Sequence, residues 1–539
     1  MVSRAQRGVI WGLWSATVVL AGVAWMGCTA IAGIQDGELA STRGPDAAAP
    51  SDGGPDATTE AQADAPSDAG GPITGKQIHY YVSLTGPAAA PVDFSTQAPS
   101  AFVPLPDGGA TAYAGTGDGQ GNFTINGMPP GAQYYVAVTA VGPFNGVATF
   151  VYTDLRTIDL SDWTLGRTNE AFAEAGVQTQ LDLGLTGLDP WESMDHVVIG
   201  SGNLGNYTRL NSSPCADGGT SCMLAYPHYD KFQDAFLIDS TRNDDTFLLQ
   251  HRVIDGGTAF YSVSGLSTKG FSIVQGQTNT LDAALATSPT TAFTAAWNHG
   301  GFAQLAGSIN PAAAITGETF QILASPIPFT NGVFGFGLAP LLYDDLRTTT
   351  TLGSGVENVS TNLFDPFPAS WPLFVYVNVT TDANLVLPAS AGLTGSLVEE
   401  GSVYCNWDST TLPSEVEPAV GPLAQPLIAN KDAFKAQTGV GTSPTLAWQA
   451  PALGTPNRYA IDIYELTVSA THQVTGSTVV GRILTQATQV TVPAGLLAAG
   501  RFYYVKFETL SESGIFAQTL LALGSPNCGA ATVSAVFAP

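Results

Sequence analysis

The sequence predicts an all-β protein in which several β-sandwich domains follow one another after a disordered, acidic stalk. Three observations support this prediction. Glycine (60) and proline (35) are frequent among the 539 residues, and both interrupt helices and suit short strands joined by turns. Hydrophobic residues make up 44% of the chain, which is enough for packed cores. Beyond residue 76, apolar and polar residues alternate with the period of two that is typical of half-buried strands.

The charge balance excludes some partners. Lysine and arginine together number 18, against 44 acids, and the formal net charge is −26. Binding to nucleic acid requires clustered basic side chains that contact phosphates, and the sequence has no such cluster. We therefore expect no nucleic-acid partner.

Residues 1–27 have the pattern of an export signal. Arg4 and Arg7 precede an uncharged apolar stretch that runs from Val9 to Trp25. Such a stretch, soon followed by acidic residues, is too short to span a membrane comfortably.

The end of the signal indicates how the chain is anchored. Gly27-Cys28 resembles the lipobox of bacterial lipoproteins, in which a small residue precedes a cysteine that receives lipid. The resemblance implies lipidation of Cys28, an N-terminal membrane anchor and, with Thr29 next to the cysteine, an outer-membrane or cell-surface location. Two alternatives remain open: ordinary cleavage after residues 30–32 (Ala-Ile-Ala) and an uncleaved anchor.

Residues 28–75 are predicted to form a disordered tether rich in Asp, Ala, Pro and Gly. Large apolar side chains are almost absent, so little can offset the entropy of ordering, and like charges keep the segment extended. An acidic stalk after a lipidated cysteine resembles many surface lipoproteins of myxobacteria. The resemblance implies a spacer between the membrane and the folded domains.

Residues 76–168 are predicted to form the first sandwich. Within them, residues 119–138 contain a turn, a short strand, a Pro-Gly turn and a strand that begins with Tyr134. This order resembles the transthyretin-like, carboxypeptidase-regulatory β-sandwich, which implies an accessory module without an active site.

Residues 423–539 are predicted to form the last sandwich. Trp448, the strand 459–464 and the segment Leu497-Ala498-Ala499-Gly500-Arg501-Phe502-Tyr503 resemble the B strand, the C strand and the tyrosine corner of fibronectin type III domains. The resemblance implies an immunoglobulin-like sandwich. In it, Trp448 would fill the core and the Tyr503 hydroxyl would bond to the backbone of the corner. Tyr134 has the same spacing from a Pro-Gly pair, which predicts the same device in the first module.

The middle of the chain is predicted to hold two β domains of unknown type, 174–325 and 326–422. Prolines and glycines that follow Ala324 suggest the boundary between them. The best helical candidates anywhere in the chain are the short segments 169–175 and 431–436.

Four cysteines remain after Cys28, an even number in a chain predicted to be exported. Cys215 and Cys222 flank a short flexible loop, so we predict that they form one disulfide. Cys405 and Cys528 then form the other by elimination.

Metal and cofactor sites have weak support. Asp239, Thr241, Asn243 and Asp245 offer oxygen atoms at alternate positions, as a weak calcium-binding loop would, although an acidic hairpin tip is the favoured interpretation. The cysteine and histidine spacings fit no zinc site. The segment 200–205 matches G-x-G-x-x-G, but no helix pattern follows it, so a glycine-rich turn is the better interpretation and no cofactor is expected.

Two functions remain in competition. The anchor, the stalk and the end modules favour a non-catalytic surface protein that binds or scaffolds an envelope polysaccharide or a protein. The alternative is a surface hydrolase with its site in 174–422, where Asp195-His196 or His228 with Asp230 would supply an oriented imidazole. Four tryptophans in that region suit either a sugar-stacking platform or a core: Trp191, Trp297, Trp371 and Trp407.

The lipobox generates the first testable prediction. A Cys28→Ala variant should lose the label when cells are grown with radioactive palmitate, because the acyl chain has no acceptor. The parent protein should be labelled under the same conditions. Undiminished labelling of the variant would contradict the assignment of the anchor.

Overall fold

β-Strands make up nearly all of the regular structure in this computed structural model, so the predicted all-β fold class is confirmed. Several sheets are arranged as sandwich-like domains. The structure describes residues 71–105, 109–138, 147–169, 171–174, 176–210, 215–232, 235–254, 258–325, 335–336, 339–350, 352–512 and 527–539. No helix within these ranges is both long enough and apolar enough to cross a membrane. The signal, Cys28 and most of the tether lie outside the described residues.

Two four-stranded sheets are formed by strands of the N-terminal module, together with β21 (Gly335–Phe336) from the middle of the chain. The first has the order β10 (Thr157–Asp159), β1 (Ile73–Lys76), β7 (Asn122–Ile125) and β6 (Gly115–Gly117). The second has the order β21, β11 (Asp162–Leu165), β2 (Ile78–Ser83) and β3 (Gly86–Pro91). Because β1 begins at Ile73, the last residues of the predicted tether are part of the first sheet.

A large sheet of 18 described strands runs through the molecule. From the N-terminal module it takes β4 (Ala101–Pro104), β5 (Ala110–Tyr113), β8 (Tyr134–Val138) and β9 (Ala148–Thr153). From the middle it takes β13 (His196–Ser201), β14 (Asn206–Leu210), β16 (Asp245–Ile254), β17 (Ala259–Lys269), β20 (Ala313–Ala324), β22 (Leu341–Thr348), β24 (Leu373–Asn384) and β25 (Val398–Asp408). From the C-terminal module it takes β28 (Gln437–Thr438), β30 (Arg458–Val468), β31 (Val474–Thr485), β33 (Tyr503–Glu512), β34 (Asn527–Val533) and β35 (Phe537–Ala538).

This sheet crosses the boundary predicted at residue 326. β20, on one side of it, pairs along its length with β22 and β24 on the other side. The proline- and glycine-rich segment that suggested a boundary connects strands of one sheet. The middle of the chain is therefore not divided there into two separate sheets.

Smaller layers cover the large sheet and bury its apolar faces. Against β13, β14 and β16 packs a three-stranded sheet, β15 (Ser221–Tyr226), β12 (Gln180–Thr186) and β18 (Thr278–Ala284). The helix α2 (His299–Ala306) packs against β20, β24 and β25, and β23 (Val356–Phe364), which forms a two-stranded antiparallel sheet with β19 (Thr290–Asn298), lies against β17 and β22. In the C-terminal module a four-stranded sheet, β27 (Lys431–Asp432), β26 (Ala424–Ile428), β29 (Thr445–Gln449) and β32 (Gln489–Thr491), faces β30, β31 and β33.

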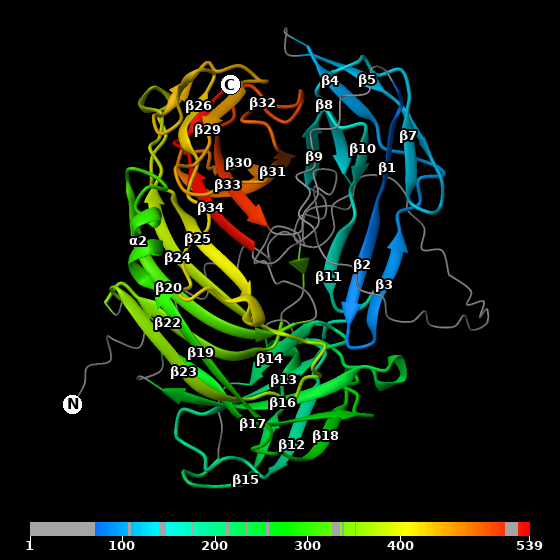
Figure 1. Cartoon of the computed structure of the whole chain (residues 1–539), viewed down its shortest axis with the longest axis vertical. Helices are drawn as coiled ribbons and strands as arrows, with labels where there is room; N and C mark the ends of the chain where they lie inside the picture. The colour runs from blue at the N-terminus through cyan, green and yellow to red at the C-terminus, as the bar shows by residue number, and fades with distance from the viewer. Residues whose placement is uncertain are drawn as a thin grey trace.

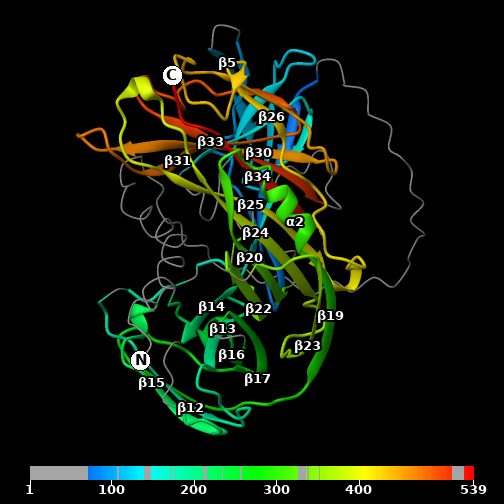
Figure 2. The ribbon, with the colours of Figure 1, turned by 90° about the vertical axis from the view of Figure 1, so that its left-hand side faces the viewer.

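The N-terminal and C-terminal modules meet in space. Five residue pairs join β9 to β31 in parallel, from Ala148 with Gly481 to Tyr152 with Thr485. Tyr135 on β8 packs in the C-terminal core and donates a hydrogen bond to the carbonyl of Thr491. Figure 1 shows the cyan β9 beside the orange β31, and the green module that contains β12 and β15 at the opposite end of the molecule in both views (Figures 1 and 2).

Trp448 lies at the centre of the C-terminal core, as expected. The prediction of helices at residues 169–175 and 431–436 was wrong. Trp448 is buried on β29 and contacts Tyr459 and Phe507 at ring-centroid distances of 5.2 and 5.6 Å. Residues 431–436 form β27 and a turn, and the described part of 169–175 contains no helix. The eight-residue α2 was not predicted, because two glycines in its first turn disfavour a helix by propensity.

Both predicted disulfides are present. Cys215–Cys222 closes a loop at the start of β15, with a sequence separation of 7. Cys405–Cys528 joins residues that lie directly opposite each other on β25 and β34, with a separation of 123. The second bond therefore ties the C-terminal module to the middle of the chain.

The two disulfides should contribute differently to the free energy of unfolding, because they close loops of different length. Replacing both Cys405 and Cys528 by alanine should lower the free energy of unfolding in urea by about 5 kcal/mol, because the bond restrains a long loop in the unfolded chain. The matched control, alanine at Cys215 and Cys222, should cost about 2.5 kcal/mol. A larger loss in the control pair would contradict this ranking.

Candidate binding site

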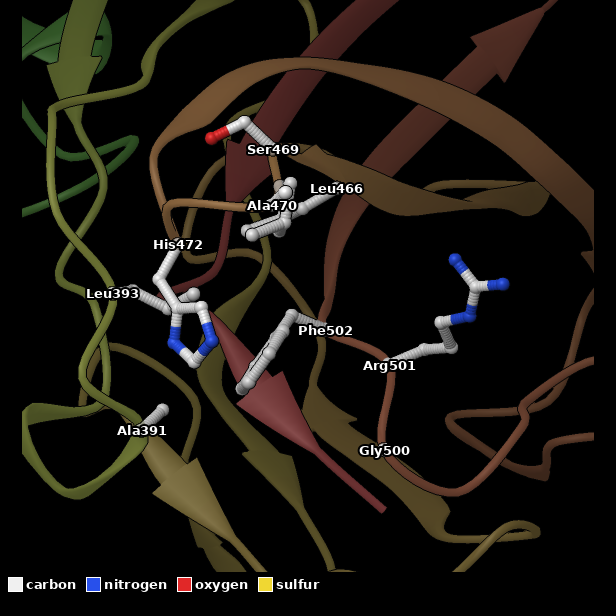
Figure 3. Close-up of a pocket in the computed structure, with 10 residues that line it drawn as sticks. Ala391, Leu393, Leu466, Ser469, Ala470, His472, Gly500, Arg501 and Phe502 are labelled. Carbon is white, nitrogen blue, oxygen red and sulfur yellow. The ribbon is translucent and has the colours of Figure 1, made fainter.

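A pocket of about 420 Å³ lies on the C-terminal module (Figure 3). Three segments surround it: the loop that connects β24 to β25, the tip of the β30–β31 hairpin, and the residues that lead into β33. Its volume is near the lower end of the range of about 300–1,000 Å³ found for small-molecule sites. The pocket therefore suits a small group or one part of a larger ligand.

Backbone hydrogen bonds fix the walls of the pocket. The amide of Thr394 donates to the carbonyl of His472 at 2.9 Å, and the amide of Val474 donates to the carbonyl of Thr394 at 3.0 Å. These bonds hold the connecting loop against the hairpin tip. The amide of Leu466 donates to the carbonyl of Phe502 at 2.8 Å, which holds the third segment in place. The walls are thus formed before any ligand arrives.

The hairpin tip has a constrained backbone. His472 has a φ of +62°, in the left-handed region that residues other than glycine adopt infrequently. The hydroxyl of Ser469 accepts a hydrogen bond from the amide of Gln473 at 3.1 Å, which stabilises this turn. The turn positions the His472 imidazole at the pocket, where Figure 3 shows it on the same side as Leu393.

The floor of the pocket is apolar. Leu466 is buried and belongs to a small core with Leu385, Val474 and Tyr504. Half-buried Leu393, Val468 and Phe502 pack on the edge of that core and leave apolar surface at the pocket. An apolar group that entered would cover surface now in contact with water, which is favourable.

A polar rim begins at Arg501. Its Nη1 lies 3.2 Å from Glu465 Oε1, and its side chain is 64% exposed. In Figure 3 this side chain extends away from His472. The hydroxyl of Tyr503 accepts a hydrogen bond from the Ala498 amide at 2.9 Å and lies 3.2 Å from Glu465 Oε2. The corner expected at Tyr503 is therefore present and supports this rim.

The corner expected at Tyr134 is different. Its hydroxyl donates to the carbonyl of Leu155, which lies after β9, rather than to the backbone around the Pro-Gly turn. The same spacing thus produces two different contacts.

The first residue pair considered for a hydrolase, Asp195 with His196, does not form an oriented acid–imidazole pair. The carboxylate of Asp195 contacts Arg252, with Oδ1 3.1 Å from Nε, and accepts a hydrogen bond from Gln250 at 2.9 Å. His196 is buried, and its Nε2 lies 3.2 Å from Nδ1 of His251. Asp195 therefore does not orient the imidazole that follows it.

The second proposed pair and the glycine-rich segment also have structural explanations. Nδ1 of the half-exposed His228 lies 4.0 Å from the buried carboxylate of Asp230, whose Oδ1 accepts a hydrogen bond from the Thr179 amide at 3.2 Å. Residues 200 and 201 end β13 and residues 202–205 form the turn to β14, in agreement with the turn interpretation.

The candidate calcium loop does not form a set of convergent ligands. The carboxylate of Asp245 is buried and accepts hydrogen bonds from the Ser201 hydroxyl and the Asn203 amide, each at 3.0 Å. Asp239 accepts from the amide and the hydroxyl of Thr241 and caps the short turn that ends at Asn243. The described residues contain no group of three or more His, Cys, Asp or Glu arranged to hold a metal ion. Asp245 points inward because it begins the buried strand β16.

The four tryptophans follow the core interpretation. Trp191, Trp297 and Trp371 are buried, and Trp407 is half-buried against the same core as Trp297. None of the three buried rings offers an open face for stacking on a sugar.

A buried polar network was not predicted from the sequence. His299, at the start of α2, places Nδ1 2.7 Å from Glu318 Oε2, and both side chains are almost fully buried. Arg347 contacts Glu357 at 2.8 Å and Asp345 at 2.6 Å, and its hydrogen bonds to Glu357 lower the pKa of that carboxyl. The network ties α2 to β20, β22 and β23. The participants are too far apart in the sequence for any spacing motif to reveal them.

Comparisons with known proteins give little further information. No family model matches the chain, and no curated protein matches it. Among solved structures, a Streptococcal ancillary pilin is similar at 9% identity and a TM-score of 0.12, over 64% of this chain and 98% of the pilin. Trypsin-activated alpha-2-macroglobulin from Escherichia coli is similar at 9% identity and a TM-score of 0.11, over 84% of this chain and 28% of that protein. Likenesses this weak carry no argument about fold or function.

The buried histidines generate a prediction about pH. Burial lowers the pKa of His251 to about 3 and also lowers that of His196. Below pH 6.5 the unfolded chain therefore binds protons that the folded chain does not, so these groups reduce stability as the pH falls. Asp344, whose pKa burial raises to about 7, has the opposite effect, because the unfolded chain releases its proton first as the pH rises above about 4.

A His251→Gln variant should isolate one of these contributions. Between pH 7 and pH 5 its free energy of unfolding should fall by about 2 kcal/mol less than that of the parent, as measured by urea unfolding at each pH. Asp344 is present in both proteins, so its effect cancels. An unchanged slope for His251→Gln would contradict the prediction.

Proposed function

We propose that the chain is a non-catalytic lipoprotein, anchored to the outer membrane or cell surface through Cys28, that binds a macromolecule at the cell envelope. The observation that carries this proposal is the preformed pocket of about 420 Å³ on the C-terminal module, with an apolar floor and a polar rim. The lipobox and the acidic tether support the anchoring. The two disulfides are compatible with export to an oxidising compartment.

The contacts of the candidate catalytic residues favour binding over hydrolysis. Asp195 and His196 are engaged separately, one with Arg252 and the other with His251. A general base needs an imidazole within hydrogen-bond reach of the substrate, and His196 is buried. The surface hydrolase is therefore the less well supported function.

Cosedimentation with isolated cell envelopes tests the proposal. The purified mature protein should bind envelopes, and a Leu393→Gln variant should bind at least tenfold more weakly, because it places an amide in the apolar pocket. Leu453→Gln is the matched control, since Leu453 is 41% exposed and does not line the pocket.

Two outcomes would contradict the proposal. One is the absence of envelope binding by the parent protein. The other is turnover of an ester, peptide or glycoside substrate that is lost in a His228→Ala variant, which would support the hydrolase.

A further inference from the structure

The chemistry of the pocket specifies what enters it. None of its ten lining residues is an Asp or Glu, although the chain has 44 such residues. The side chains that form its floor are aliphatic or aromatic, among them Leu393, Leu466 and Phe502, while Ser469 and His472 add polar groups at the hairpin tip. The interior therefore accepts an apolar group and offers it few hydrogen bonds.

The rim provides a cationic donor beside this apolar interior. Nη1 of Arg501 contacts Glu465, whereas the other two guanidinium nitrogens make no hydrogen bond to any described residue. A guanidinium has five N–H donors in a fixed plane and suits a carboxylate. Because Arg501 extends away from His472 (Figure 3), an anion would bind at the rim while an apolar group occupies the interior.

We propose that the pocket binds the C-terminal residue of a peptide chain, with its aliphatic or aromatic side chain between Leu393 and Phe502 and its carboxylate at Arg501. The assignment rests on the proposed binding function and names the partner as a protein or peptide. A C-terminal residue combines an apolar side chain and an anion within the small volume of about 420 Å³. A neutral saccharide fits less well, because its many hydroxyls need polar partners and the polar side chains among the lining residues are those of Ser469, His472 and Arg501 alone.

Peptide titration of the mature protein tests this assignment. The probes are N-acetyl-Ala-Ala-Phe with a free carboxylate, the same peptide with a C-terminal amide, and maltotriose. Calorimetry should show that the free acid binds about tenfold more tightly than the amide, because the amide lacks the charge-assisted hydrogen bond. Maltotriose should bind more weakly than the free acid.

Two variants assign the preference to the rim. Arg501→Gln should bind the acid and the amide equally well. Lys435→Gln removes the same charge at a 79% exposed side chain outside the pocket and should keep the parent's preference. Equal binding of acid and amide by the parent protein would overturn the proposal, as would an undiminished preference in Arg501→Gln or tighter binding of maltotriose.

Envelope cosedimentation separates this proposal from the proposed function. If the parent protein binds envelopes but none of the peptides, the assignment of the ligand is overturned and the binding function stands. If the parent binds neither, both are overturned.

Discussion

The parallel pairing of β9 with β31 is the interaction that joins the N-terminal module to the C-terminal one. It joins strands that are far apart in the sequence, and the hydrophobic side chain of Tyr135 reinforces it inside the C-terminal core. Bringing distant segments together has an entropy cost that grows only slowly with loop length, so a short ladder with a buried aromatic anchor can offset it. The N-terminal module thereby becomes a lateral support for the C-terminal one.

A buried ion pair lies at the same seam. Arg482 on β31, whose register partner on β9 is Thr149, places Nε 2.6 Å and Nη2 2.7 Å from the two carboxylate oxygens of Asp462 on β30. Burying these charges is costly unless they pair, and the bidentate geometry satisfies both partners. A shift of β31 against β30 would separate them, so the pair favours one register. The register in turn fixes the position of the hairpin tip that carries His472 at the pocket.

Local patterns predicted the parts of this structure that depend on neighbouring residues. Alternation predicted the strands, and the resemblance of residues 497–503 to a tyrosine corner predicted the hydrogen bond of Tyr503. Features that depend on distant residues were missed. The helix α2 has two glycines in its first turn and is stabilised instead by the Asn298 cap and the burial of Phe302. The boundary expected at residue 326 failed because proline and glycine mark a break in the backbone pattern, which occurs within a sheet as well as between domains.

The pocket was likewise invisible in the sequence. Leu393, His472 and Phe502 belong to three segments that only the assembled sheet brings together. Each segment alone has the sequence pattern of an ordinary loop with one or two apolar residues. By contrast, the oxygen-rich loop from Asp239 to Asp245 matched a ligand pattern, but hydrogen bonds within the fold use the carboxylate of Asp245.

Residue-resolved amide hydrogen exchange in β9 tests the union of the two ends most directly. In an antiparallel pair with β8 alone, only alternate amides of β9 would be hydrogen-bonded, whereas a second ladder to β31 protects the intervening ones as well. Slow exchange at consecutive amides across residues 148–152 is therefore expected. Fast exchange at every second amide would show that β9 is a free edge and would contradict the account.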